Sequence, residues 1–330
     1  SETEEEWLLR RAAAVHKADT ELPGAASRLS QMVLSPVAAE LDTKRLLIVP
    51  DGALQYVPFS ALPVPSVSTN EDEGARRQLV FNHEIVTLPS ASTLAFLSRE
   101  ARKRTPSPKA CALFADPVFG GEDDERVKNK IKGGFKRLRH TRKEAEAISA
   151  ITGPEGTLQA LDFEASRSAV LNTDLTQYRI VHFATHGLAD SVHPELSGVV
   201  LSLVDEEGEA QDGFLRLYDI YNLRLSADLV VLSACRTALG KDVRGEGLVG
   251  LIRGFMYAGA SRIVASLWEV DDVATAELMT LFYRGMHRGL PYAAALRNAQ
   301  VKWLEQTDTN HSPFYWAAFT IQGEWHPPPY

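Results

Sequence analysis

Two apolar segments that each end in a reactive side chain decide how this sequence folds. Residues 181–187 read Val-His-Phe-Ala-Thr-His-Gly, and residues 228–237 read Asp-Leu-Val-Val-Leu-Ser-Ala-Cys-Arg-Thr. The nearly continuous apolar run of the second segment is typical of a central parallel strand that is covered on both faces. Because ligands in open α/β sheets bind beyond the carboxyl ends of the strands, we expect His186 and Cys235 to lie on one sheet edge, after neighbouring strands.

Strands and helices alternate outward from these two segments, which predicts an α/β sandwich. In the second half we predict strands over 179–184, 198–203, 228–233, 262–267 and 314–322, and helices over 142–152 and 247–258 with two more across 273–306. In the first half we predict helices over 5–18 and 29–41, strands over 45–50, 84–88 and 110–115, and a short helix that begins after 89–92 and ends near residue 104. The organisation is therefore a helical lead-in at 1–44, a first half at 45–140 and a second half at 141–330.

Composition excludes several classes of protein. The 330 residues carry 35 Lys and Arg against 43 Asp and Glu, a net charge of -8, which disfavours direct binding to nucleic acid or anionic lipid. No apolar run approaches the roughly 20 residues that a membrane span needs, so we expect no membrane association. Cys111 and Cys235 are the only cysteines, and their number predicts a reducing, cytoplasmic location without a disulfide framework.

The pairing of Cys235 with His186 predicts nucleophilic catalysis. A thiol becomes a strong nucleophile when a neighbouring imidazole takes its proton, and the backbone N–H of Gly187 could approach a developing oxyanion closely. Two plainer interpretations stay open: Cys235 as a small buried hydrophobe, and His182 as a structural histidine of the core. His182 and His186 are roughly 13 Å apart along a strand, so we expect no shared metal ion and no cofactor.

Two further segments invite an interpretation. Residues 245–250 match the dinucleotide fingerprint G-x-G-x-x-G, but eleven residues separate the preceding strand from it and Glu246 would face a pyrophosphate. We therefore expect only a glycine-rich start of a helix that packs closely on the sheet. Residues 117–143 hold nine basic residues between Arg126 and Lys143, which predicts a solvated connector or, alternatively, a docking or cleavage loop.

An ordered set of motifs resembles the CHAT domains, a family within the caspase–separase group of cysteine peptidases that is often attached to tetratricopeptide repeats. The motifs are HFATHG at 182–187, LSACRTALG at 232–240, RGEGLVGLIRGFMYAGA at 244–260, SLWEVDD at 266–272, LLIVPDGALQYVPFSAL at 46–62, LPSASTL at 88–94, ADPVFG at 115–120 and FYWAAFTIQGEW at 314–325. The resemblance implies a caspase-like α/β/α sandwich with a mostly parallel central sheet and a pseudo-caspase-like N-terminal half. It also implies that His186 and Cys235 are the catalytic pair, with the N–H groups of Gly187 and Cys235 as the oxyanion hole. Ser233 and Thr237 depart from the caspase signature around the cysteine and fit the CHAT and separase side, which gives no support to aspartate specificity.

The segment 266–272 is expected to help select the substrate. It leaves the predicted strand 262–267 on the same edge as the catalytic pair and carries Trp268, Glu269, Asp271 and Asp272. Asp271 or Asp272, with Asp272 favoured, is expected to cap the helix that starts at Val273, and the same acids favour a basic residue before the scissile bond. A long apolar residue is the second expectation, and an acidic one is disfavoured.

The sequence therefore predicts a cysteine endopeptidase that cleaves protein substrates and is regulated by an upstream repeat module or a sensor partner. A catalytically silent caspase-like scaffold is the alternative, and a hydrolase or transferase acting on a small thioester is a third. The resemblance weakly implies a role in bacterial defence or cell-death signalling. The lead-in helices at 1–44 have a small apolar face, so we expect them to have leaned on an upstream module.

Overall fold

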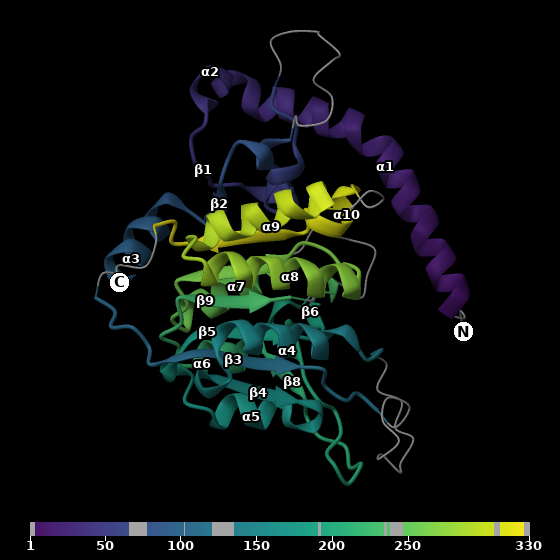
Figure 1. Ribbon diagram of the computed structural model, residues 1–330, viewed down its shortest axis with the longest axis vertical. Coiled ribbons are helices and arrows are strands. Elements are labelled where there is room, and N and C mark those ends of the chain that lie inside the picture. The colour runs from purple at the N-terminus through teal and green to yellow at the C-terminus, as the bar shows by residue number, and fades with distance from the viewer. Residues whose placement is uncertain are drawn as a thin grey trace.

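A sheet of eight strands, in the order β1-β2-β12-β11-β9-β5-β3-β4, runs through the middle of the protein (Figure 1). The computed structural model describes residues 4–65, 78–101, 103–120, 135–190, 193–233, 236–237, 247–306 and 311–326. The strands are β1 Leu46–Ile48, β2 Ile85–Thr87, β3 Lys109–Ala115, β4 Thr157–Leu161, β5 Tyr178–Ala184, β9 Leu229–Leu232, β11 Arg262–Ser266 and β12 Phe319–Gly323. All neighbouring strands are parallel except β11 and β12, so β3, β4, β5, β9 and β11 share one carboxyl edge.

Helices cover both faces of this sheet, which gives the predicted α/β/α sandwich. One face carries α4 His140–Thr152, α8 Asp272–His287 and α9 Tyr292–Gln306 (Figure 1). The other face carries α5 Arg167–Asn172, α6 Leu217–Asn222 and α7 Gly247–Tyr257. The remaining helices are α1 Glu4–Leu34, α2 Ala38–Leu41, α3 Ala91–Ala101 and α10 Pro313–Trp316. Short 3-10 turns lie at Ser35–Val37, Gly52–Tyr56, Phe59–Ala61, Leu79–Phe81, Pro154–Gly156, Asp162–Glu164, Leu175–Gln177 and Pro194–Leu196.

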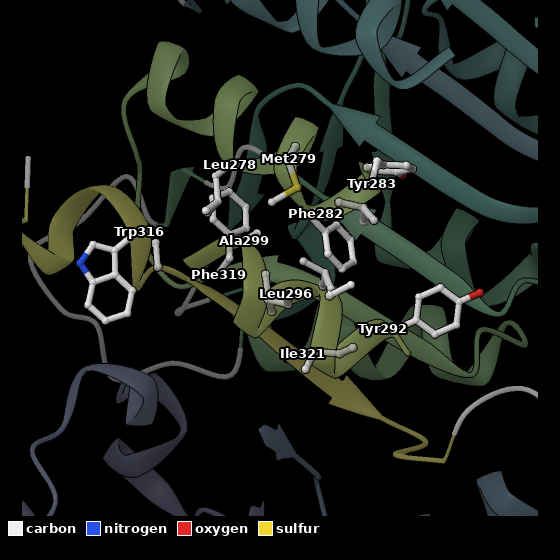
Figure 2. Packing of buried hydrophobic residues seen from close by; sticks show 14 of the residues in the cluster. Leu278, Met279, Phe282, Tyr283, Tyr292, Leu296, Ala299, Trp316, Phe319 and Ile321 are labelled. Carbon is white, nitrogen blue, oxygen red and sulfur yellow. The ribbon is translucent and has the colours of Figure 1, made fainter. Parts of the chain in front are cut away.

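The core consists of two apolar layers, one on each side of the sheet. Figure 2 shows the first layer, where Leu278 and Phe282 of α8 and Leu296 of α9 converge on Phe319 and Ile321 of β12. Consecutive strand residues enter opposite layers because side chains alternate along a strand. The nearly continuous apolar run around β9 predicted a strand covered on both faces, and β9 is buried at every position. Strand β11 is buried at every position too.

A second, four-stranded sheet in the order β10-β6-β7-β8 was not predicted. Its strands are β6 Gly187–Ala189, β7 Gly198–Val200, β8 Phe214–Arg216 and β10 Arg236–Thr237. The strand expected over 198–203 thus belongs to this small sheet and not to the central one. Gly247 starts α7 against the same sheet, and a Cβ there would lie 2.9 Å from the carbonyl oxygen of Asp190, so the expected close packing of this helix is confirmed. Residues 245 and 246 of the fingerprint lie outside the described part of the chain.

Three sequence expectations need correction in detail. One helix, α1, spans Glu4–Leu34 through Pro23 where two helices over 5–18 and 29–41 were expected. The last strand begins at Phe319 and not at 314, because Pro313–Trp316 forms α10. The edge strand β4 was missed altogether, since only one of its five residues is buried.

The predicted division at residue 140 falls within a continuous sheet. The first-half strand β3 pairs with β4 and β5 of the second half, whereas β1 and β2 of the first half pair with each other and with β12. The division stays a prediction. Within the residues that the structure describes, no helix combines the length and apolar character needed to cross a membrane.

Candidate functional site

The carboxyl edge of β5 and β9 carries the first part of the candidate site. These two strands pair in parallel, as predicted from the sequence, and His182 of β5 is level with Val231 of β9. His186 lies two residues beyond the end of β5, and Ser233 follows β9 directly, with its backbone N–H donating to the Phe183 carbonyl over 3.0 Å. Cys235 itself lies outside the described residues.

The residues that follow Cys235 return to the same edge. Arg236 and Thr237 form β10, which pairs in parallel with β6, so that Arg236 is level with Leu188 and Thr237 with Ala189. Gly187, the first residue of β6, is buried and pairs with Val199 on the other side. The described residues on both sides of Cys235 therefore flank the segment that contains His186 and Gly187.

The imidazole of His186 is enclosed, with only 4% of the residue exposed. The rings of Phe119 and Phe135 lie 5.3 and 5.5 Å from it, centroid to centroid. Its Nε2 lies 2.7 Å from the carbonyl oxygen of Lys136. Because a carbonyl oxygen can only accept, Nε2 donates in this hydrogen bond, and the neutral ring then carries its lone pair on Nδ1.

His182 belongs to the core, as expected for a structural histidine. It is fully buried, its Nδ1 lies 2.9 Å from the hydroxyl of Tyr283 in α8, and its Nε2 lies 2.9 Å from Oε1 of Glu144 in α4. Glu144 and Tyr283 are buried too, and burial raises the pKa of Tyr283 well above its ordinary value. Cys111, buried in β3, has a thiol whose pKa is raised by burial, which makes it inert.

The acidic segment 266–272 follows β11, on the same carboxyl edge. The indole of Trp268 is half-buried and donates to the Phe314 carbonyl over 3.0 Å, whereas Glu269 is exposed. The expectation that Asp272 caps the helix is wrong. Asp271 caps α8, and its Oδ1 accepts from the N–H groups of Val273 and Ala274. The reason is that α8 starts one residue early, at Asp272, which places Asp271 at the capping position.

Asp272 makes a different contact from the one predicted. Its Oδ2 accepts from the backbone N–H of His140, the first residue of α4, over 2.9 Å. Burial raises the pKa of Asp272, and the hydrogen bond from His140 offsets only part of this effect. The carboxylate therefore ties the start of α4 to the start of α8.

A cluster of four charged residues at the ends of β3 and β4 was not predicted. Nε and Nη2 of Arg137 donate to the two carboxylate oxygens of Asp116 over 2.7 and 2.8 Å, and Nη2 also donates to Asp162. Arg142 reaches the same two acids, over 2.8 Å to Asp116 and 2.6 Å to Asp162. Burial would raise the pKa of Asp162, but the hydrogen bonds and charges of Arg142 and Arg137 outweigh it and lower this pKa.

The motif ADPVFG at 115–120 is the one sequence signal that points to this cluster, because it puts an aspartate directly after a predicted strand. The expectation of a solvated connector over 117–143 is wrong for its described part, since the Arg137 side chain is only 11% exposed. Residues 121–134 lie outside the described part of the chain. No group of three or more His, Cys, Asp or Glu residues with the spacing of a metal site occurs in the regions that the structure covers.

Comparison with known proteins adds a family and a fold. A family model described as the CHAT domain matches residues 24–324. Tetratricopeptide repeat protein 28 of Mus musculus and that of Homo sapiens are each 26% identical to this chain over 310 residues. The match covers 85% of this chain but only 12% of each relative, so the chain spans about an eighth of their length.

Two solved structures share the fold at low sequence identity. The separase of the Saccharomyces cerevisiae separase–securin complex superimposes with a TM-score of 0.52 at 14% identity, over 85% of this chain and 16% of separase. The Arg-specific cysteine proteinase gingipain R superimposes with a TM-score of 0.53 at 11% identity, over 95% of this chain and 76% of gingipain. The predicted caspase-like fold with a mostly parallel central sheet is thereby confirmed.

Proposed function

Because this chain belongs to the CHAT domain family and has a caspase-like fold, we propose that it is a cysteine endopeptidase with Cys235 and His186 as its catalytic pair. The observation that carries the proposal is the common edge: His186 follows β5, while Ser233 and Arg236, on the two sides of Cys235, adjoin β5 and β6. A thiol nucleophile and an imidazole base need this proximity.

The proposed mechanism is acyl transfer. The Cys235 sulfur forms a bond to the scissile carbonyl carbon as His186 takes the thiol proton, and the N–H groups of Gly187 and Cys235 stabilise the resulting oxyanion. His186 then gives the proton to the leaving amine as the C–N bond breaks. Water, deprotonated by His186, finally hydrolyses the thioester and frees the thiol.

We propose a protein segment with a basic residue before the scissile bond as the preferred substrate. Glu269, Asp271 and Asp272 put negative charge near the end of β11, on the carboxyl edge that β5 and β9 share, and Trp268 adds an aromatic surface there. Opposite charge favours Arg or Lys over a long apolar residue, and disfavours Asp or Glu. Peptides that vary only this position, cleaved by wild type, Asp271→Ala and Asp272→Ala, test the assignment. An Arg preference that neither substitution alters would refute it.

A catalytically silent scaffold is the second candidate function, and the enclosure of His186 favours it. An imidazole that is 4% exposed and bonded to the Lys136 carbonyl is not open to a substrate in this conformation. The likeness to tetratricopeptide repeat protein 28 supports a repeat module or sensor partner in a longer parent chain, acting in a reducing compartment such as the cytoplasm. Equal activity of this chain and of a parent with the repeats would speak against such regulation.

The decisive experiment for the proposed function measures peptide cleavage by two site variants and one control variant. Cys235→Ala is expected to abolish peptide cleavage, and His186→Ala to lower it by about 10²- to 10⁴-fold, the usual contribution of general acid–base catalysis. Cys111→Ser is the matched control, because that thiol is buried in β3 and its removal should leave kinetics near wild type. Cleavage that survives in Cys235→Ala would rule out the peptidase, whereas folded wild-type protein that cleaves no peptide would favour the scaffold.

A further inference from the structure

Residues 135–142, which we call the strap, cross the site over His186. The strap supplies the Phe135 ring beside the imidazole and the Lys136 carbonyl that accepts from Nε2. Phe135 also contacts Phe119 in a tilted arrangement and approaches Phe214 of β8 edge-on, with ring centroids 5.7 and 6.1 Å apart. The strap is thus packed against the candidate catalytic residue by both backbone and side chain.

Arg137 fastens the strap immediately after these contacts. Its guanidinium inserts between Asp116 and Asp162, which follow the neighbouring strands β3 and β4, and it is 11% exposed, so solvent screens these ion pairs weakly. Charge-assisted bidentate contacts of this kind are the strong class of hydrogen bonds. Arg137 therefore anchors the strap to the Asp116–Asp162 pair, which we call the socket.

The socket residues have a strained backbone. Asp116 and Asp162 both have a φ of 53°, in the left-handed region that residues other than glycine rarely adopt. Such strain persists only where surrounding contacts impose it, and it gathers at ligand clamps and switch regions. Two strained aspartates at adjacent strand ends, which together hold Arg137 and Arg142 of a crossing segment, fit a clamp better than an ordinary surface ion pair.

Besides the contacts of Arg142 with Asp116 and Asp162, two further hydrogen bonds attach the strap. The Thr141 hydroxyl accepts from the backbone N–H of Asp116 over 3.1 Å, and the backbone N–H of His140 donates to Asp272. Three of the acids at this edge, Asp116, Asp162 and Asp272, are therefore engaged by the strap while His186 lies beneath it. Any substrate that reaches His186 must first displace residues 135–137.

We propose that the strap is an autoinhibitory segment, closed by the seating of Arg137 between Asp116 and Asp162, and that its release opens His186. The proposal rests on the proposed function of His186 and adds its regulation. In the closed state Lys136 occupies Nε2 and Phe135 covers the ring. In the open state both are withdrawn and Arg137 has left the acid pair, which Arg142 still contacts.

The test compares Arg137→Gln with Arg139→Gln in the complete chain. Both remove one charge from the strap, but the Arg139 guanidinium has no hydrogen bond or ion pair among the residues that the structure describes, so it is the matched control. The readout is carbethoxylation of His186 by diethyl pyrocarbonate, followed by mass spectrometry. His193, whose side chain is 61% exposed, serves as the internal reference for reagent reactivity.

We expect Arg137→Gln to raise the modification rate of His186 relative to His193 by about tenfold or more, the scale set by losing charge-assisted hydrogen bonds. Arg139→Gln should match wild type. Asp162→Asn, which weakens the socket without touching the strap, should give an intermediate increase. Denaturant unfolding confirms that each variant is folded at the assay temperature, and if Arg137→Gln is not, the Asp162→Asn result decides.

The outcomes separate the strap from the peptidase. Faster modification of His186 together with faster peptide cleavage supports both proposals. Faster modification without any cleavage supports the strap and counts against the peptidase. Unchanged modification of His186 in folded Arg137→Gln and Asp162→Asn overturns the strap, whatever the peptidase activity is.

Discussion

Replacing His182 by alanine should destabilise the fold strongly while leaving the chemistry intact in the molecules that remain folded. His182 is fully buried between α4 and α8, where Nδ1 is 2.9 Å from the Tyr283 hydroxyl and Nε2 is 2.9 Å from Glu144. The substitution removes the imidazole that contacts both groups, and it leaves the buried Glu144 carboxyl and the buried Tyr283 hydroxyl facing an empty space.

The size of the effect follows from these contacts. Loss of the ring and the cavity it leaves cost about 2 kcal/mol. The Tyr283 hydroxyl, deprived of its partner, adds about 1 kcal/mol. The buried Glu144 carboxyl loses its contact with Nε2 of His182, which adds about 1–3 kcal/mol. We therefore expect a total loss of about 4–6 kcal/mol in the free energy of unfolding, out of the roughly 5–15 kcal/mol of an ordinary domain.

Urea unfolding followed by circular dichroism measures this loss. His193→Ala is the control, because that imidazole is 61% exposed and its removal should change stability by less than about 0.5 kcal/mol. Peptide cleavage per folded molecule should be near wild type for His182→Ala and strongly reduced for His186→Ala. A loss below about 1 kcal/mol in His182→Ala would refute the structural role derived from burial and partners.

Two further predictions concern the backbone and the acid pair. Gly259→Ala should be less stable than Gly289→Ala by about 2 kcal/mol in chemical denaturation. Both glycines have positive φ, but a Cβ at Gly259 would lie 2.2 Å from the Leu225 carbonyl oxygen, whereas a Cβ at Gly289 would meet no atom within 4 Å. Equal losses would show that the backbone relaxes at no cost. The pKa of Asp162 is lowered because Arg142 and Arg137 outweigh the effect of burial. Asp162 therefore contributes stability above its unfolded pKa of about 3.9, and this contribution is lost as pH falls through the lower folded value. Asp162→Asn should therefore flatten the dependence of unfolding free energy on pH between about 4 and 2, and an unchanged slope would contradict the ion pairs.

Local patterns predicted the central elements and the position of His186 at the sheet edge. The nearly continuous apolar run over 228–233 predicts a buried strand because a strand covered on both faces is apolar at nearly every position. His186 could be placed at a sheet edge for the same reason, since it comes just after such a strand. Asp271 and Asp272 were placed near a helix start, but the choice between them depended on where α8 begins, which composition does not fix to one residue.

Other elements have sequence patterns too weak to predict them. The strands β6, β7, β8 and β10 have two or three residues each, shorter than any periodicity can register. Strand β4 at the edge of the sheet buries one residue of five, so it lacks the alternation of a half-buried strand. The helix α1 continues through Pro23, where a break is the ordinary expectation for a proline in a helix.

By itself, the sequence determined which residues carry reactive groups and that they follow strands of an α/β sheet. Only the tertiary structure decided what covers His186. Arg137 meets Asp116 across 21 residues and Asp162 across 25, a meeting that requires β3 and β4 to be neighbours and the chain to return over both. The enclosure of His186 by Lys136, 50 residues away, has the same origin. Strand runs are set by side chains close in sequence, whereas ion pairs between strand ends and loops arise from chain packing, which no local pattern encodes.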